Sequence, residues 1–115
     1  MSNAMQGNTN VTMNAIATIT ANAATECYGV VGMASKHSIR DGIAELLGRD
    51  NYSRGVFAKK KGHEIEIDMY IVVSYGVRIT EVVSEVQKKV KYVLEKTLNR
   101  KFNKINVYVQ NIKNL

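Results

Sequence analysis

The sequence has one cysteine, no proline and no long apolar segment. Its single cysteine, Cys27, excludes an internal disulfide and makes a reducing compartment the simpler environment. There is no proline anywhere, and no low-complexity linker or internal repeat marks a domain boundary. No apolar run approaches the ~18 residues that cross a bilayer, and no secretory leader opens the chain. We therefore expect a soluble protein that inserts into no membrane directly.

The length predicts one domain. A chain of 115 residues with 45% hydrophobic and 23% charged residues has the composition of an ordinary globular protein. Such a chain buries about two-thirds of its unfolded surface, enough for one core. Residues 1–4 resemble an expression-tag remnant before a second methionine, Met5. We expect residues 5–115 to form a single compact α+β domain.

The strongest pattern lies between Glu64 and Leu98. Its first part, EIEIDMYIVVSYG, alternates in the period of two that places one strand face on a core. The predicted core positions are Ile65, Ile67, Met69, Ile71, Val73 and Tyr75. From Tyr70 the second face is apolar too, through Tyr70 and Val72, which predicts cover on both faces there.

After Gly76 the apolar period becomes helical. The predicted apolar stripe of this long helix holds Ile79, Val83, Val86, Val90, Val93 and Thr97, widened by Val82, Leu94 and Leu98. Segment 12–27 alternates partly like a strand, but its alanines and its apolar spacing favour a helix. The other predicted elements are a short strand near residues 28–34, a short helix from Ser35 or Ser38 to Leu47, a polar connection over 49–53, hairpin strands over 54–61 and 63–75, and a last strand over 105–110.

The predicted order is therefore α-β-α-β-β-α-β, with a mixed four-stranded sheet and the long amphipathic helix packed on it. Val56 and Ala58 are expected to face the core from the first hairpin strand. The second hairpin strand, the long helix and the last strand should form a right-handed crossover that joins two parallel strands.

The sequence offers no constellation for catalysis, for a metal or for a cofactor. His37 and His63 lack further ligands at metal-binding spacing. Cys27 lacks the cationic setting that activates a thiol, and a small core residue is expected there. The motif Gly29-Val-Val-Gly32 has the GxxG spacing of KH-type RNA-binding loops, but its two valines favour a buried strand.

Three carboxylates, Glu64, Glu66 and Asp68, share one strand face. Such spacing suits a paired-acid or hard-cation site. The alternating strand instead favours a solvated face that pairs with Lys59 and Lys61 across the hairpin. We predict the solvated face.

The net charge of +6 is concentrated near the C-terminus. The basic patch comprises Lys88, Lys89, Lys91, Lys96, Arg100, Lys101 and Lys104. It could meet nucleic acid, an anionic membrane surface or an acidic protein. The alternative is a solvated helix face whose lysines sit near the helix C-terminus, where the dipole favours them.

Tyrosines could add a stacking platform to this patch. The strand pattern instead places Tyr75 in the core and Tyr70 and Tyr108 on the second sheet face. If no helix covers that face, Tyr70, Val72 and Tyr108 form an apolar interaction surface.

Three motifs stand out in the sequence: CYGVVGMASK from Cys27, YSRGV from Tyr52 and IDMYIVVSYG from Ile67. Together they resemble the alkaline shock protein family, the envelope stress response proteins of Gram-positive bacteria. The resemblance runs from about Val11 to Ile112 and is nearest to the short single-domain members. Two features depart from the family pattern: only Asn8 to Asn14 stands where relatives have an extended segment, and the helix start at Ile79 lacks their proline.

The resemblance implies a non-enzymatic cytoplasmic protein without a cofactor. It implies a homo-oligomer that gathers near the membrane through a small integral membrane partner and serves envelope and alkaline stress responses. The residues leave open one alternative, a small RNA-binding domain that uses the basic patch from Lys88 to Lys104.

Overall fold

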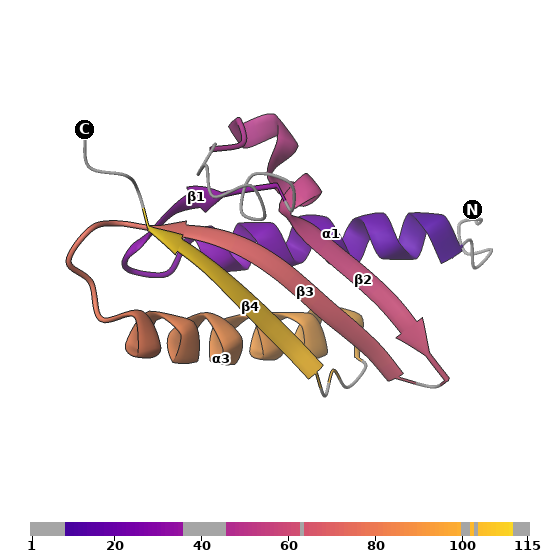
Figure 1. The fold of residues 1–115 in the computed structure, drawn as a ribbon. Coiled ribbons are helices and arrows are strands. Elements are labelled where there is room, and N and C mark those ends of the chain that lie inside the picture. Colours follow the sequence, from indigo (N-terminus) through magenta and orange to yellow (C-terminus); the bar gives the residue numbers. More distant parts are fainter. Residues whose placement is uncertain (1–8, 36–45, 63, 100–101, 103, 112–115) are drawn as a thin grey trace.

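The computed structural model describes residues 9–35, 46–62, 64–99, 102 and 104–111 (Figure 1). Within them the α+β fold with a four-stranded mixed sheet is confirmed. In chain order the elements are α1 (Thr9–Thr25), β1 (Val30–Met33), the 3-10 helix η1 (Arg49–Gly55), β2 (Val56–Lys61), β3 (Glu64–Val73), α3 (Ile79–Leu98) and β4 (Lys104–Asn111).

Strand β3 is the centre of the sheet. Both β1 and β2 pair antiparallel with it along one edge, β1 beside its last residues and β2 beside its first (Figure 1). Strand β4 pairs parallel with the other edge, from Glu66 opposite Lys104 to Val73 opposite Asn111. The predicted parallel pair on either side of the long helix is therefore confirmed.

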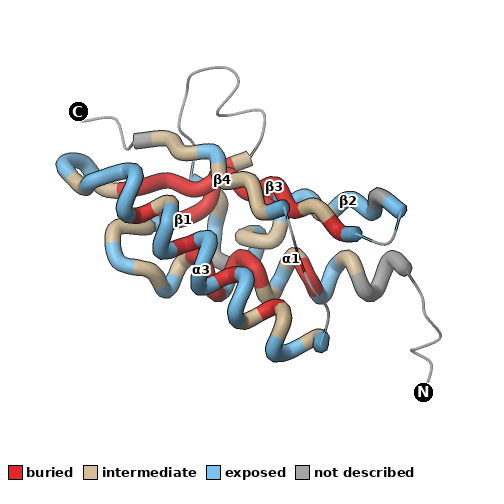
Figure 2. The backbone as a smooth tube through the Cα atoms, turned by 90° about the horizontal axis from the view of Figure 1, so that it is seen from below, coloured by how far each residue is buried: buried red, intermediate tan, exposed pale blue. Residues whose placement is uncertain are grey.

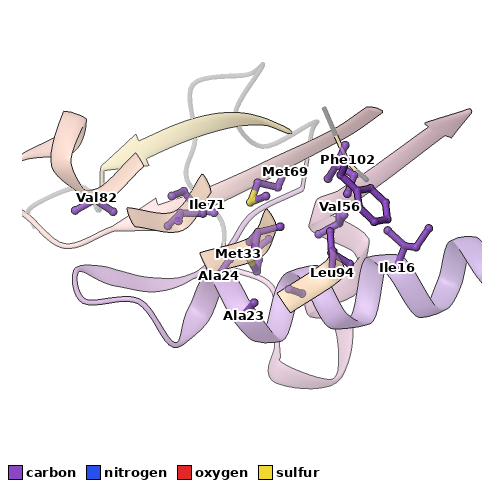
Figure 3. Close-up of a cluster of buried hydrophobic side chains, with 14 of the residues drawn as sticks. Ile16, Ala23, Ala24, Met33, Val56, Met69, Ile71, Val82, Leu94 and Phe102 are labelled. Atoms are coloured by element: carbon purple, nitrogen blue, oxygen red, sulfur yellow. The ribbon is translucent and has the colours of Figure 1, made fainter. Parts of the chain in front are cut away.

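The core lies between the sheet and the two long helices, which both lie on one face of the sheet (Figure 2). The odd positions of β3 from Ile65 to Val73 are all buried, as the alternation predicts. Figure 3 shows Met69 and Ile71 of β3 in one cluster of buried side chains with Ala24 of α1 and Val82 of α3. We call this face of the sheet the inner face.

Helix α3 is amphipathic, and its buried stripe lies within the predicted one but is narrower. The buried residues are Val82, Val86, Val90 and Leu94. Ile79 and Thr97 are exposed, whereas Val83, Val93 and Leu98 are half-buried.

The prediction of a buried Tyr75 is wrong. Strand β3 ends at Val73, and the chain turns at Gly76, whose φ of 89° lies in the region that favours glycine. The Tyr75 side chain lies beyond the sheet and is 76% exposed.

Two connections also differ from the sequence pattern. Residues 49–53 are not a plain polar connection but belong to η1, so β2 begins at Val56 and not at Arg54. Gly55 ends η1 against β1, where a Cβ would lie 2.8 Å from the Ala34 carbonyl oxygen. Helix α1 is confirmed as a helix, although it spans Thr9–Thr25 and not 12–27.

Some predictions fall on parts of the chain outside the described residues. The predicted short helix before Gly48 lies mostly in 36–45. Its last residues are described: Leu46 forms an isolated β-bridge with Ala34, and the Leu47 N–H donates to the Met33 carbonyl. Residues 1–8, which include the proposed tag remnant, are likewise not described.

Candidate interaction surface on the outer sheet face

The sheet face opposite α1 and α3, here called the outer face, is assembled from three strands. The register aligns Phe57 of β2 with Asp68, and Asn106 of β4 with Asp68 from the other side. The same pairing aligns Tyr108 with Tyr70. Even positions of β3 therefore share this face with Phe57, Asn106 and Tyr108.

Three aromatic side chains, Phe57, Tyr70 and Tyr108, form what we call the aromatic cluster. The rings of Tyr70 and Tyr108 stack with centroids 4.8 Å apart and planes 15° apart. Phe57 meets Tyr70 edge to face at 5.9 Å and 85°. Both geometries are favourable for aromatic pairs.

The three rings of the aromatic cluster differ in their exposure to solvent. Tyr70 is only 8% exposed, whereas Phe57 is 39% exposed and Tyr108 is 44% exposed. The buried ring in the middle thus fixes two half-exposed aromatic side chains in place. An apolar platform of this kind suits a protein contact.

Beside the aromatic cluster lies a polar bridge of three side chains. The Asn106 side-chain amide donates to Glu66 Oε2 and to Asp68 Oδ1, both at 2.8 Å. Lys59 Nζ lies 3.5 Å from Asp68 Oδ2. These contacts tie β2, β3 and β4 together on the outer face.

The predicted solvated acidic face is wrong for Asp68, which is 8% exposed. Glu66 is half-buried, and Glu64 alone of the three carboxylates is exposed. Asn106, which is 38 residues away in sequence, covers Asp68 from β4. The predicted pairing with Lys59 is confirmed through Asp68, and backbone register places Lys61 opposite Glu64.

Burial also perturbs the central tyrosine. Burial raises the pKa of the Tyr70 phenol above its usual value of 10.0, and the nearby Asp68 and Tyr108 raise this pKa further. The Tyr70 hydroxyl therefore stays protonated at pH values where an exposed tyrosine ionises.

The predicted interaction residues differ in accessibility. Tyr108 presents its ring to solvent, Tyr70 supports it, and Val72 is fully buried inside the protein. Val72 pairs with Gly32, and a Cβ at Gly32 would lie 2.8 Å from Leu46 Cδ2, so this end of the face is closely packed. Sequence reasoning missed Phe57, although inward-facing Val56 and Ala58 imply an outward residue between them.

The described residues of the predicted basic patch lie on two elements, α3 and the start of β4. Lys88, Lys89, Lys91 and Lys96 are exposed on α3, on the other side of the molecule from the outer face. Lys104 lies on the first position of β4, opposite Glu66. Arg100 and Lys101 lie outside the described residues.

Two lysines of α3 have partners of their own. Lys89 Nζ lies 3.1 Å from Glu26 Oε1, at the end of α1. Lys96 Nζ donates to the Tyr92 hydroxyl at 3.2 Å and lies 5.4 Å from the centre of the same ring. These contacts engage part of the charge that a polyanion would use.

We next consider metal-binding and nucleophilic residues in the parts of the chain that the structure describes. No group of three His, Cys, Asp or Glu side chains there is placed to hold a metal ion. His37 and His63 fall outside those parts. Cys27 packs partly buried against the core, and burial raises the pKa of its thiol, partly offset by Lys89. Among the described helices, none is both long and apolar enough to span a membrane.

Solved structures show the same fold in other proteins. A variant of the MamM CTD superposes with a TM-score of 0.59 at 19% sequence identity, over 88% of this chain and 84% of that domain. A copper form of the MamM CTD superposes with a TM-score of 0.54 at 17% identity, over 90% and 89%. At this identity the likeness concerns the fold alone.

Sequence relatives are nearer. The Bacillus subtilis protein YloU is 46% identical over 107 residues, which cover 93% of this chain and 89% of YloU. The Streptococcus pyogenes protein Spy1614 is 49% identical over 98 residues, covering 85% and 81%. The B. subtilis protein YqhY is 30% identical over 106 residues, covering 92% and 77%.

A family model matches residues 1–114, and its description is a family of cell envelope-related function. This match and the relatives confirm the resemblance carried by the three sequence motifs. The chain belongs to the alkaline shock protein 23 family.

Proposed function

We propose that the protein is a non-enzymatic, self-associating interaction module that serves the envelope-related function of its family. The observation that carries the proposal is the aromatic cluster, which holds Phe57 and Tyr108 half-exposed on a sheet face. Both long helices lie on the inner face and leave these rings accessible.

The make-up of the outer face supports a protein contact. Interfaces concentrate aromatic residues at their centre and place polar groups at the rim. Here the aromatic cluster stands beside the polar bridge of Asn106, Glu66 and Asp68. A tyrosine held by stacking loses little conformational freedom on binding, which favours association.

Sedimentation of the purified protein over a wide concentration range tests self-association. We expect the wild-type mass to rise with concentration and the Tyr108→Glu variant to remain monomeric, because a carboxylate in the contact would be desolvated without a partner. The matched control is Tyr92→Glu on α3, where Tyr92 is 62% exposed and far from the outer face. A wild-type protein that stays monomeric at all concentrations overturns the proposal.

We further propose that a small membrane-anchored partner gathers the protein at the cytoplasmic membrane. Cell fractionation tests this part. We expect the protein to sediment with membranes and to be released by an alkaline carbonate wash, as a protein held only by a partner would be. A protein that stays in the soluble fraction of gently lysed cells contradicts it.

The nucleic-acid alternative is tested on the same preparation. We expect no mobility shift with mixed RNA at low salt. A shift that weakens steeply with salt and is lost in a Lys88→Glu, Lys91→Glu variant would assign the function to the basic patch instead.

A further inference from the structure

The two edges of the sheet differ in how they are protected against pairing with another chain. On one edge, β1 has four residues and an irregular register between Val30 and Gly32. Strand β2, on the same edge, ends in three consecutive lysines. Short strands, irregular pairing and lysines are the devices that keep edge strands from adding a partner.

Strand β4 has few of the features that protect an edge strand from pairing with another chain. It is eight residues long, pairs with β3 without interruption, and has one charged residue, Lys104, at its first position. Residues 105–110 are uncharged and rich in β-branched and aromatic residues. Among the described strands, β4 pairs with β3 alone, so its other side is an open edge (Figure 1).

The backbone of β4 offers bonding groups on that open edge. The Gln87 side chain of α3 donates to the Ile105 carbonyl at 2.9 Å, outside the sheet ladder. Successive carbonyls of a strand point to opposite sides, so those of Val107 and Val109 point the same way as that of Ile105. An added strand would find donors and acceptors at Val107 and Val109, whereas the Ile105 carbonyl already accepts from Gln87.

We propose that β4 pairs with the β4 strand of a second copy of this chain, antiparallel and about a twofold axis at Tyr108. The inference rests on the proposed self-association and names its surface and geometry. The two sheets would join into one, and the two aromatic clusters would meet at the axis.

The register is self-complementary, which favours a second copy as the occupant. With Tyr108 opposite its counterpart, Asn106 faces Gln110 of the second copy, and Val107 faces Val109. Two side-chain amides can each donate and accept, and two β-branched side chains pair well across strands. In this register, each amide side chain faces an amide, each valine faces a valine, and Tyr108 faces Tyr108 of the second copy.

Charge points to the same edge. Each copy carries a net charge of +6, and several exposed lysines lie on α3, so a contact made through the lysine-bearing surface of α3 would bring like charges together. The uncharged stretch 105–110 lets two copies approach with little repulsion. An acidic partner protein would instead be drawn to α3.

Cysteine cross-linking in a Cys27→Ala background tests the register. In antiparallel pairs, residues at the axis have Cα atoms about 4.5–5.5 Å apart, within disulfide range. We expect Tyr108→Cys to form a disulfide-linked dimer at least about tenfold faster than Gln110→Cys, since docking raises the effective thiol concentration. The Gln110→Cys pair would be about 14 Å apart, four residues of strand rise. Sedimentation first establishes that both cysteine variants still self-associate, and equal rates in associating protein overturn the proposal.

Amide hydrogen exchange provides a second measurement on the unaltered protein. We expect protection of the Val107 and Val109 amides to rise at least about tenfold between dilute monomer and concentrated protein, because these amides become hydrogen-bonded. Self-association without this protection overturns the β4 pairing and leaves the proposed function standing. A chain that never self-associates overturns both.

Discussion

The two faces of β3 are both buried at the middle of the strand, but by different means. The inner face is apolar from Ile65 to Val73 and is covered by α1 and α3. The outer face changes along the strand from exposed Glu64 to buried Asp68, Tyr70 and Val72. Neighbouring strands cover Asp68 and Tyr70 through Asn106, Phe57 and Tyr108.

This difference shows that a sheet face can become buried without a long helix on it. On the inner face the gain comes mainly from apolar area removed from water, at about 25 cal/mol per Å². On the outer face, hydrogen bonds replace those with water, so each contributes only about 1 kcal/mol net. The inner face should therefore carry more of the stability, and the outer face should hold β4 in register.

The largest effect is expected from a truncation on the inner face. Ile71→Ala should lower the free energy of unfolding by about 2–5 kcal/mol, because it leaves a cavity in a fully buried site. Urea denaturation measures the loss. The control, Val31→Ala, removes an exposed side chain of β1 and should cost less than about 0.5 kcal/mol. Equal losses would contradict the difference between the two sites.

A smaller effect is expected from reversing the polar bridge. Asn106→Asp replaces an amide donor to Glu66 and Asp68 with a third carboxylate, and should cost about 1–3 kcal/mol at neutral pH. In the variant the three carboxylates repel one another, and protonation relieves this repulsion, so the lost stability returns as the pH falls.

Urea denaturation at pH 7 and pH 5 measures this effect. The matched control is Gln110→Glu, which adds one negative charge to the same strand away from the two carboxylates. A loss for Asn106→Asp that is the same at both pH values would indicate a purely steric cause.

The smallest effect is expected from Tyr70 at alkaline pH. Its folded-state pKa is raised above 10.0, so the folded state holds the phenol proton more tightly than the unfolded chain. The resulting stability is present in full below about pH 10 and is lost as the pH rises through the folded-state pKa. Wild-type stability should therefore fall more steeply above about pH 10 than that of Tyr70→Phe.

Urea denaturation at pH 9 and above follows this change, with Tyr75→Phe, an exposed tyrosine, as the control. A Tyr70→Phe protein that loses stability as steeply as the wild type would show that the outer face does not shield the phenol.

Sequence reasoning succeeded where the periodicity of a single strand or helix was enough to predict its structure. Period-two alternation identified every inner position of β3 up to Val73, and the change of period at Gly76 identified α3. Family motifs identified the family. Within α3, however, the buried stripe passes through Val82, Val86, Val90 and Leu94, because α1 and the sheet decide which side of the helix faces the core.

Where sequence reasoning failed, the environment of the residue depended on contacts or strand ends that its own segment does not reveal. Asp68 reads locally as a surface carboxylate, and only Asn106 and Lys59 show why it is buried. Tyr75 continues the alternation but stands past the last hydrogen-bonded pair of β3. Phe57 looks unremarkable in a lysine-rich strand until Tyr70 packs against its ring.

The sequence by itself determined the order of the four strands and of helices α1 and α3, the inner face of the sheet, the family and the absence of an internal disulfide. Local periodicity can do this because it states which residues of a strand or helix share a side. Only the tertiary structure decided what covers each side: that β4 shields Asp68, that Phe57 and Tyr108 stay half-exposed, and that no described strand pairs with the outer side of β4. These depend on contacts between residues tens of positions apart, which no local pattern encodes.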